Sequence, residues 1–160
     1  MMSRNQKKGL QGERWATEAL EKLGYRVVMP RDFFSECCDL VVNDRLSVEV
    51  KLSYQKTLRK QLKTGIGTYP RWQWDVQQVD DRDRVLILIA QDNQGVNHPF
   101  IMPGHVMAHR VRFEINSHPL AYKGLIAKFL GAWEVVEFML GSQAAKSNDL
   151  QIGELMSYDR

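Results

Sequence analysis

The segment "DLVVNDRLSVEVKL", residues 39–52, limits the fold of this chain more than any other feature. Its two apolar runs flank a tight turn at residues 43–45, which is the pattern of a β-hairpin. Side chains along a strand point alternately to opposite faces. One face of the second strand therefore carries apolar side chains that must belong to a core: Val48, Val50 and Leu52.

Charged side chains occupy the opposite face of this hairpin. Asp39 and Glu49 each lie five residues from Asp44 at the turn. The hairpin can therefore align them as a cross-strand pair, with side chains about 5 Å apart. Two facing carboxylates repel and are costly to bury unless a proton or a cation is shared. Lys51 on the same face supplies part of the compensation, and a divalent metal ion would supply more.

The remaining periodicity predicts one helix before the hairpin and one after it. The first covers residues 3–23, with Ser3 or Asn5 as its cap and Gly24 as its stop. The second is an amphipathic helix at residues 71–79. Further strands are expected at residues 25–29, 84–90, 99–103 and 111–115, with a helical turn at 104–110. Residues 51–69 are expected to be partly helical and partly loop, and residues 131–140 fit either a helix or a strand.

This order of elements, α-β-β-β-α-β, indicates an α/β fold with a central mixed sheet flanked by helices. The segment "RVLILIA", residues 84–90, is continuously apolar and is therefore expected at the centre of the sheet. A chain of 160 residues is long enough for one domain. We expect a single domain over residues 1–140 and a loosely ordered C-terminal tail over residues 141–160.

Composition and cysteine usage indicate a cytoplasmic protein. The chain is 44% hydrophobic and 26% charged, which is typical of soluble globular proteins. It contains no apolar run near the roughly 18 residues of a membrane span, and its start has no apolar signal-peptide core. Cys37 and Cys38 are neighbours, which is a poor basis for a structural disulfide and favours a reducing compartment.

Basic charge is concentrated in the first half of the chain. Residues 51–71 contain six Lys or Arg residues and no acid. Such asymmetry favours a polyanionic partner, although a solvated basic surface would explain the charge alone equally well. Trp74 could stack on bases or pack in the core. The candidate nucleic-acid-binding residues are Lys56, Arg59, Lys60, Lys63, Arg71 and Trp74.

A third carboxylate is expected to join the hairpin charges. Glu13 lies on the apolar stripe of the first helix, three residues after Leu10 and three before Ala16. It is therefore aimed at the sheet. Carboxylates gathered in this way suit Mg²⁺, which prefers oxygen ligands and lowers the pKa of bound water for phosphodiester hydrolysis. The alternative is a surface salt-bridge cluster in which Lys51 lies between the carboxylates.

A helix glutamate, then Asp39, then Glu-x-Lys on a hairpin resembles the PD-(D/E)xK nuclease superfamily. The opening "KKGLQGERWATEALEKLGYRVVMPR", with "CDLVV" and "VEVK", is most similar to its Holliday-junction-resolvase-like and restriction-endonuclease-like branches. The resemblance implies a restriction-endonuclease-like αβββαβ core. It also implies that Asp39, Glu49 and the Val50 carbonyl bind Mg²⁺, for which Mn²⁺ could substitute. Lys51 would orient water or stabilise charge, and Glu13 would support the metal site.

The sequence thus predicts an Mg²⁺-dependent endonuclease that hydrolyses phosphodiester bonds of branched or duplex DNA. Its expected partner is DNA, no membrane association is expected, and a homodimer is left open. One alternative is a noncatalytic nucleic-acid-binding module on the same fold. Another is a small structural protein with a salt-bridged hairpin, which would respond to neither metal nor nucleic acid.

Overall fold

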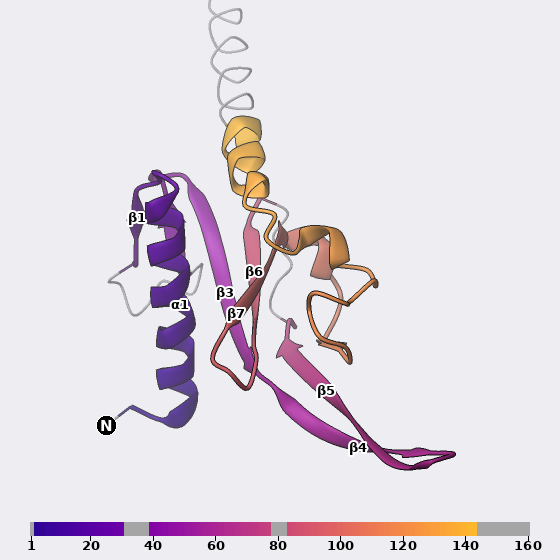
Figure 1. The fold of residues 1–160 in the computed structure, drawn as a ribbon. Coiled ribbons are helices and arrows are strands. Elements are labelled where there is room, and N and C mark those ends of the chain that lie inside the picture. Colours follow the sequence, from indigo (N-terminus) through magenta and orange to yellow (C-terminus); the bar gives the residue numbers. More distant parts are fainter. Residues whose placement is uncertain (1, 31–38, 78–82, 144–160) are drawn as a thin grey trace, which may run out of the picture.

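The computed structural model describes residues 2–30, 39–77 and 83–143 (Figure 1). Cys37 and Cys38 lie outside these ranges, as do residues 78 and 79 of the expected second helix. Among the described residues, no helix has the length and apolarity needed to cross a membrane.

The first helix forms as the sequence predicts. Helix α1 spans Arg4–Lys22, and the Ser3 hydroxyl accepts the Gln6 backbone N–H. The Gln6 side chain in turn accepts the Ser3 N–H, which completes a capping box. Gly24 follows the helix with a φ of 95°, a left-handed conformation that favours glycine.

The main sheet has five strands in the order β1-β2-β3-β6-β7. Strands β1 to β3 pair antiparallel, β3 pairs parallel with β6, and β6 pairs antiparallel with β7. The expected α/β fold with a central mixed sheet is therefore confirmed, and "RVLILIA" supplies the internal strand β6. The bounds are Val27–Val28 for β1, Leu40–Val42 for β2, Leu46–Tyr54 for β3, Val85–Gln91 for β6 and Asn97–Pro103 for β7.

The hairpin of β2 and β3 has the register expected from the sequence. Leu40 pairs with Val48, so the same register aligns Asp39 with Glu49. Residues 43–45 form the turn, in which Asn43 and Asp44 both have positive φ and the Arg45 N–H donates to the Val42 carbonyl at 3.1 Å. Asn43 also accepts the Arg26 backbone N–H through its side-chain oxygen, which ties the turn to the approach to β1.

A second sheet replaces the helix expected after β3. Strands β4 (Lys56–Leu62), β5 (Gly65–Asp75) and β8 (Arg112–Ile115) form it in the order β4-β5-β8. The predictions of helix in residues 51–69 and of an amphipathic helix from residue 71 are wrong. Trp72, Trp74 and Val76 alternate inward at the spacing of a strand, and this period prevails over the helical one.

Two hydrophobic cores cover the two faces of the main sheet. On one face, α1 and a helix at residues 134–143 pack on the apolar side of β3 and β6. On the other face, Trp72 and Trp74 of β5 pack with Leu86 and Leu88 of β6. The ambiguous segment at 131–140 is therefore helical from residue 134. Residues 141–143 continue this helix, and residues 144–160 of the expected tail lie outside the described ranges. Short 3-10 helices occur at Gly104–Met107 (η1) and Ala127–Phe129 (η2).

Hairpin β4–β5 projects away from the body of the molecule (Figure 1). Its register pairs Lys56 with Arg71 at the base and Leu62 with Gly65 at the turn. Most of β4 is exposed, whereas β5 becomes buried from Trp72 onward. The hairpin therefore has an anchored base and a free arm.

Candidate active site and basic hairpin

Three elements bring the expected carboxylates together. Glu13 comes from α1, Asp39 precedes β2, and Glu49 lies in the middle of β3. Glu13 and Asp39 form a side-chain hydrogen bond, and Asp39 also feels the charges of Glu49 and Lys51. All four residues predicted as catalytic therefore belong to one electrostatic cluster.

The acidity of Glu13 shows how strongly this cluster resists a further negative charge. Burial, and then the neighbouring Asp39 carboxylate, raise the pKa of Glu13 to about 7. Two ionised carboxylates in contact repel, so one of them holds a proton unless a cation joins them. A carboxylic acid near neutrality beside a second carboxylate is a common feature of functional sites.

Asp39 is fixed by the backbone of β3. Its Oδ2 accepts the Val50 N–H at 2.9 Å. Burial raises the pKa of Asp39, the Val50 N–H lowers it, and the Glu49 carboxylate raises it again. The expected role of the Val50 carbonyl as a metal ligand stays a prediction.

Glu49 has a partner that the sequence did not indicate. Arg84 Nη1 donates to Glu49 Oε2 at 2.5 Å, and their side chains are only 12% and 15% exposed. Lys51 Nζ lies 4.0 Å from the other oxygen of Glu49. Arg84 reaches Glu49 because the parallel register of β3 and β6 sets Glu49 opposite Leu86. Only knowledge of that strand pairing could have identified Arg84 in advance.

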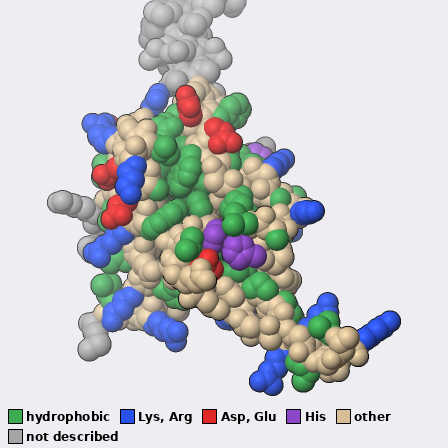
Figure 2. Space-filling view, viewed as in Figure 1, with side chains coloured by type: hydrophobic (Ala, Val, Ile, Leu, Met, Phe, Trp, Pro, Cys, Tyr) green, Lys and Arg blue, Asp and Glu red, His purple; other side chains and the backbone are tan. Residues whose placement is uncertain are grey.

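The predicted nucleic-acid-binding residues fall along the projecting hairpin. Lys56, Arg59, Lys60 and Lys63 are exposed on or beside β4, and Figure 2 shows basic side chains around the end of this arm. Arg59 and Lys60 also line a hollow of about 400 Å³ with Tyr69 and Asn116.

Two predicted contacts differ from this pattern. Trp74 is 2% exposed, and its indole N–H donates to the Ile89 carbonyl at 3.2 Å. The prediction that Trp74 stacks on bases is therefore wrong, because its ring packs in the core under β5. Arg71 lies at the base of the hairpin, where it donates to Asn116 at 2.8 Å and lies 3.6 Å from Glu114.

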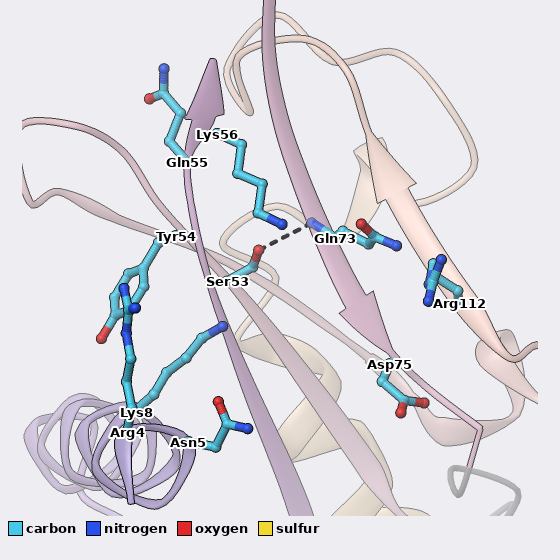
Figure 3. Close-up of a pocket in the computed structure, with 10 residues that line it drawn as sticks. All are labelled: Arg4, Asn5, Lys8, Ser53, Tyr54, Gln55, Lys56, Gln73, Asp75 and Arg112. Atoms are coloured by element: carbon cyan, nitrogen blue, oxygen red, sulfur yellow. Dashed lines mark hydrogen bonds between the residues drawn. The ribbon is translucent and has the colours of Figure 1, made fainter. Parts of the chain in front are cut away.

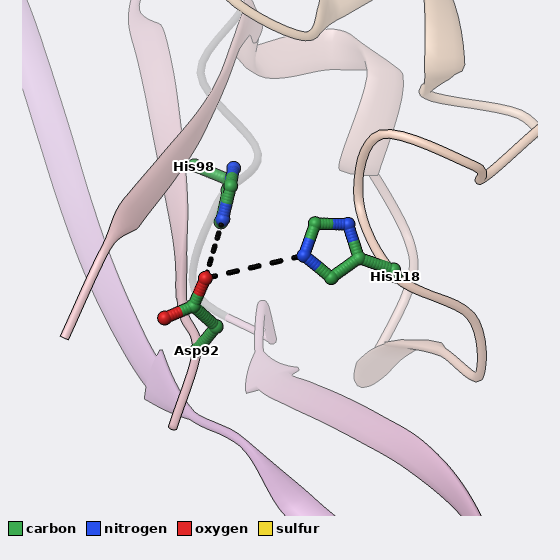
Figure 4. A group of neighbouring side chains, drawn as sticks. All are labelled: Asp92, His98 and His118. Carbon is green, nitrogen blue, oxygen red and sulfur yellow. Dashed lines mark hydrogen bonds and ion pairs between the residues drawn. The ribbon is translucent and has the colours of Figure 1, made fainter. Parts of the chain in front are cut away.

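A second group of titratable side chains comes from the residue after β6, from β7 and from the segment after β8 (Figure 4). Asp92, His98 and His118 offer three potential metal-ligand atoms within 4.8 Å of one another. Asp92 Oδ2 lies 3.0 Å from His98 Nε2 and 3.9 Å from His118 Nε2. His105 and His109, which are four residues apart in the sequence, are both exposed; His105 lies within η1 and His109 lies two residues after its end.

The tautomer of His118 favours a hydrogen-bonded group of side chains over a metal centre. The Leu120 N–H donates to His118 Nδ1 at 3.2 Å, so in the neutral ring the proton resides on Nε2. That is the nitrogen facing Asp92, and a metal ion there would require the opposite tautomer. Asp92 Oδ1 meanwhile accepts the backbone N–H groups of Gln94 and Val96. The cluster thus fastens the β6–β7 turn.

Comparison with solved structures finds a fold similar to that of this chain. No family model matches the chain, and no curated protein matches it. Among solved structures, the chain is similar to the bacterial homing endonuclease I-Ssp6803I, with a TM-score of 0.59 and 20% sequence identity. The match covers 89% of this chain and 96% of that one. At this identity the likeness establishes the shared fold, including the central mixed sheet.

Proposed function

We propose that this protein is an Mg²⁺-dependent endonuclease that hydrolyses phosphodiester bonds in DNA. The observation that carries the proposal is the convergence of Glu13, Asp39 and Glu49 with Lys51 on one part of the sheet. The solved structure with the same fold is described as a homing endonuclease, which supports the same class of activity. The residue pattern supports membership of the PD-(D/E)xK superfamily.

The donor set fits a hard divalent cation. Burial and then the adjoining Asp39 carboxylate raise the pKa of Glu13 to about 7, so a cation bound between these two carboxyl groups would relieve their repulsion. Asp39 and Glu49 would hold Mg²⁺, with the Val50 carbonyl as a further oxygen ligand and Glu13 in support. Bound there, the ion would polarise the phosphate and acidify a water molecule.

The side chains of the chain itself have separate roles in this proposal. Asp39 is oriented by the Val50 N–H, which donates to one of its two carboxylate oxygens. Lys51 lies beside Glu49 and supplies positive charge where the pentacoordinate phosphate gains negative charge. Arg84 neutralises Glu49 before substrate arrives. Hairpin β4–β5 contacts the DNA backbone outside the site.

The Glu49–Arg84 ion pair favours a second candidate, a noncatalytic nucleic-acid-binding module. If Arg84 keeps Glu49 neutralised in the presence of Mg²⁺, the site holds no ion and the fold only binds. The two candidates differ in cleavage and agree in binding. The possible homodimer and the preference for branched or duplex DNA stay predictions.

A cleavage assay separates these candidates. Purified protein is incubated with supercoiled plasmid, linear duplex and a four-way junction, in Mg²⁺, in Mn²⁺ or in EDTA. We expect strand scission that requires the metal ion and is abolished in Glu49→Gln, while the exposed-residue control Glu18→Gln cuts normally. Scission that survives in Glu49→Gln would refute the assignment. Binding without scission on every substrate would establish the second candidate.

A further inference from the structure

A cleft of about 620 Å³ lies between the first half of α1, the end of β3, and strands β5 and β8 (Figure 3). Its floor includes Ser53, whose hydroxyl accepts the Gln73 backbone N–H at 3.0 Å. This bond ties β5 to β3. The cleft is thus framed by elements that are fixed to the main sheet, unlike the free arm of hairpin β4–β5.

The cleft contains an excess of positive charge. Four cations line it, Arg4, Lys8, Lys56 and Arg112, whereas Asp75 is its one acid among the described residues. Within the described ranges, no ion pair involves any of the four cations, although Arg26, Lys51, Arg71 and Arg84 all have carboxylate partners. Clustered cations without counterions raise the energy of the free protein and favour an anionic ligand.

Lys8 is repelled by two of the other cations in the cleft. It reaches from α1 toward β3, and its Nζ lies 5.1 Å from the centre of the Tyr54 ring. The Tyr54 hydroxyl donates to Gln11 at 2.6 Å, which holds the ring in place. Burial, then the neighbouring Lys56 and Arg4, lower the pKa of Lys8. An anion between these cations would relieve both the repulsion and the burial of an uncompensated charge.

Arg112 is oriented from the opposite wall. With the Gln73 amide turned so that its oxygen faces Arg112, that oxygen accepts from Nε at 2.6 Å and from Nη1 at 3.1 Å. This leaves the remaining guanidinium N–H groups available to a ligand. Arg guanidinium groups bind phosphate oxygens with well-defined geometry.

The position of the cleft relates it to the candidate active site. Lys51 and Ser53 lie two residues apart on one strand, so their side chains share a face and their Cα atoms are about 6.6 Å apart. A nucleic-acid strand advances about 3.4 Å per nucleotide along the duplex axis. For a nucleic-acid strand that runs along β3, the cleft would therefore begin about two nucleotide steps from Lys51.

We propose that this cleft binds the sugar-phosphate backbone of the strand that enters the candidate active site, through Arg4, Lys8, Lys56 and Arg112. This inference rests on the proposed function for the identity of the ligand, while the anion-binding character of the cleft rests on its own charges. The cleft positions the strand for cleavage, and hairpin β4–β5 contributes affinity outside it.

Two measurements test the cleft, with Lys8→Gln and Arg112→Gln as the variants and Lys7→Gln as a matched control. Lys7 is exposed on the same helix and does not line the cleft. In the first measurement, tripolyphosphate is titrated into metal-free protein by calorimetry. We expect each cleft variant to bind it roughly tenfold more weakly, as for the loss of one charge-assisted hydrogen bond, and Lys7→Gln to bind normally.

In the second measurement, duplex DNA binding in Ca²⁺ is followed against salt concentration. Each cleft variant should reduce the slope of log K against log [salt] by roughly one, with Lys8→Arg restoring it. Loss of tripolyphosphate binding with an unchanged DNA slope would overturn the backbone assignment and leave the nuclease proposal standing. Equal tripolyphosphate affinity in the wild type and the cleft variants would overturn the anion site itself. Absence of any DNA binding by the wild-type protein would overturn the proposed function and the backbone assignment together.

Discussion

At the residue scale, the three carboxylates of the candidate site differ in the charged groups that surround them. Glu13 and Asp39 contact each other, whereas Glu49 lies between Lys51 and Arg84. Lys51 is the more exposed of the two cations and the more distant from Glu49. Lys51 is thus better placed to act on a substrate, and Arg84 to hold Glu49.

Lys51→Ala should separate binding from cleavage. The change leaves the carboxylates and the hairpin intact, so DNA affinity in Ca²⁺ should stay near the wild-type value. Removing a preorganised cation from the reacting phosphate should slow cleavage in Mg²⁺ by roughly 10²-fold or more. Single-turnover cleavage and a filter-binding titration measure the two effects, and Lys51→Arg should recover part of the rate. A wild-type rate in Lys51→Ala would remove Lys51 from the catalytic set.

Asp92→Asn should make stability less sensitive to acid. The hydrogen bond from His98 holds the pKa of Asp92 below its usual range, so folding favours the ionised form. The stabilisation is therefore full above about pH 4 and is lost as the pH falls through the folded pKa. The melting temperatures of the wild type and Asp92→Asn should differ at pH 6, and the difference should shrink as the pH falls below about 4. A constant difference across this range would mean that the charge of Asp92 is not what stabilises the turn.

At the element scale, α1 packs closely on β3 because one glycine permits it. A Cβ at Gly12 would lie 3.1 Å from the Leu52 Cβ and 3.5 Å from Val50 Cγ1. Leu52 Cβ is attached directly to the strand backbone and has little freedom to move. At Gly9, one turn earlier, a Cβ would meet nothing within 4 Å.

The two glycines should therefore respond oppositely to alanine. Gly9→Ala should stabilise the protein by about 1 kcal/mol, the usual gain for alanine over glycine inside a helix. Gly12→Ala should be destabilising despite the same gain, because α1 must move outward from β3. Urea unfolding of both variants measures the difference. Stabilisation in Gly12→Ala comparable to that in Gly9→Ala would show that the helix can shift at little cost.

Hairpin β4–β5 gives the element-scale prediction for binding. Lys60 and Lys63 are exposed on the free arm, where their replacement should not disturb a core. If both contact phosphates, the double change to glutamine should reduce the slope of log K against log [salt] by roughly two. Fluorescence anisotropy with a labelled duplex measures it, with Lys22→Gln at the far end of α1 as the control. An unchanged slope would place the binding surface elsewhere.

The elements that the sequence predicted well are those whose determinants are local. Ser3 and Gln6 cap α1, and the turn at Asn43 and Asp44 sets the register of β2 and β3. The prediction of a helix from residue 71 was wrong because Trp72 and Val76 have a spacing that fits both a helix and a strand. Only packing of Trp72 and Trp74 on β6 decides between them. The Arg84 partner of Glu49 depends on parallel pairing between distant strands, which no local pattern encodes.

At the scale of the whole molecule, the two sheets have different roles: one supports the candidate active site, and the other carries the arm that we propose contacts DNA. The five-stranded sheet, with α1 on one face, fixes the carboxylate cluster, and the three-stranded sheet carries the projecting arm. The cationic cleft lies where the two sheets meet, because Ser53 of β3 and Gln73 of β5 are bonded there. A polyanion that follows the arm toward the carboxylates would therefore pass through the cleft.

Metal binding should couple the site to the stability of the entire fold. Glu13, Asp39 and Glu49 come together only in the folded chain, so an ion held between them stabilises that state by mass action. At pH 7.5 we expect the melting temperature to rise with millimolar Mg²⁺ or Mn²⁺. Asp39→Asn keeps an oxygen for the Val50 N–H but loses the charge, so its melting temperature should not respond. Differential scanning calorimetry with matched NaCl controls for ionic strength, and an equal rise in both proteins would show that the ion acts elsewhere.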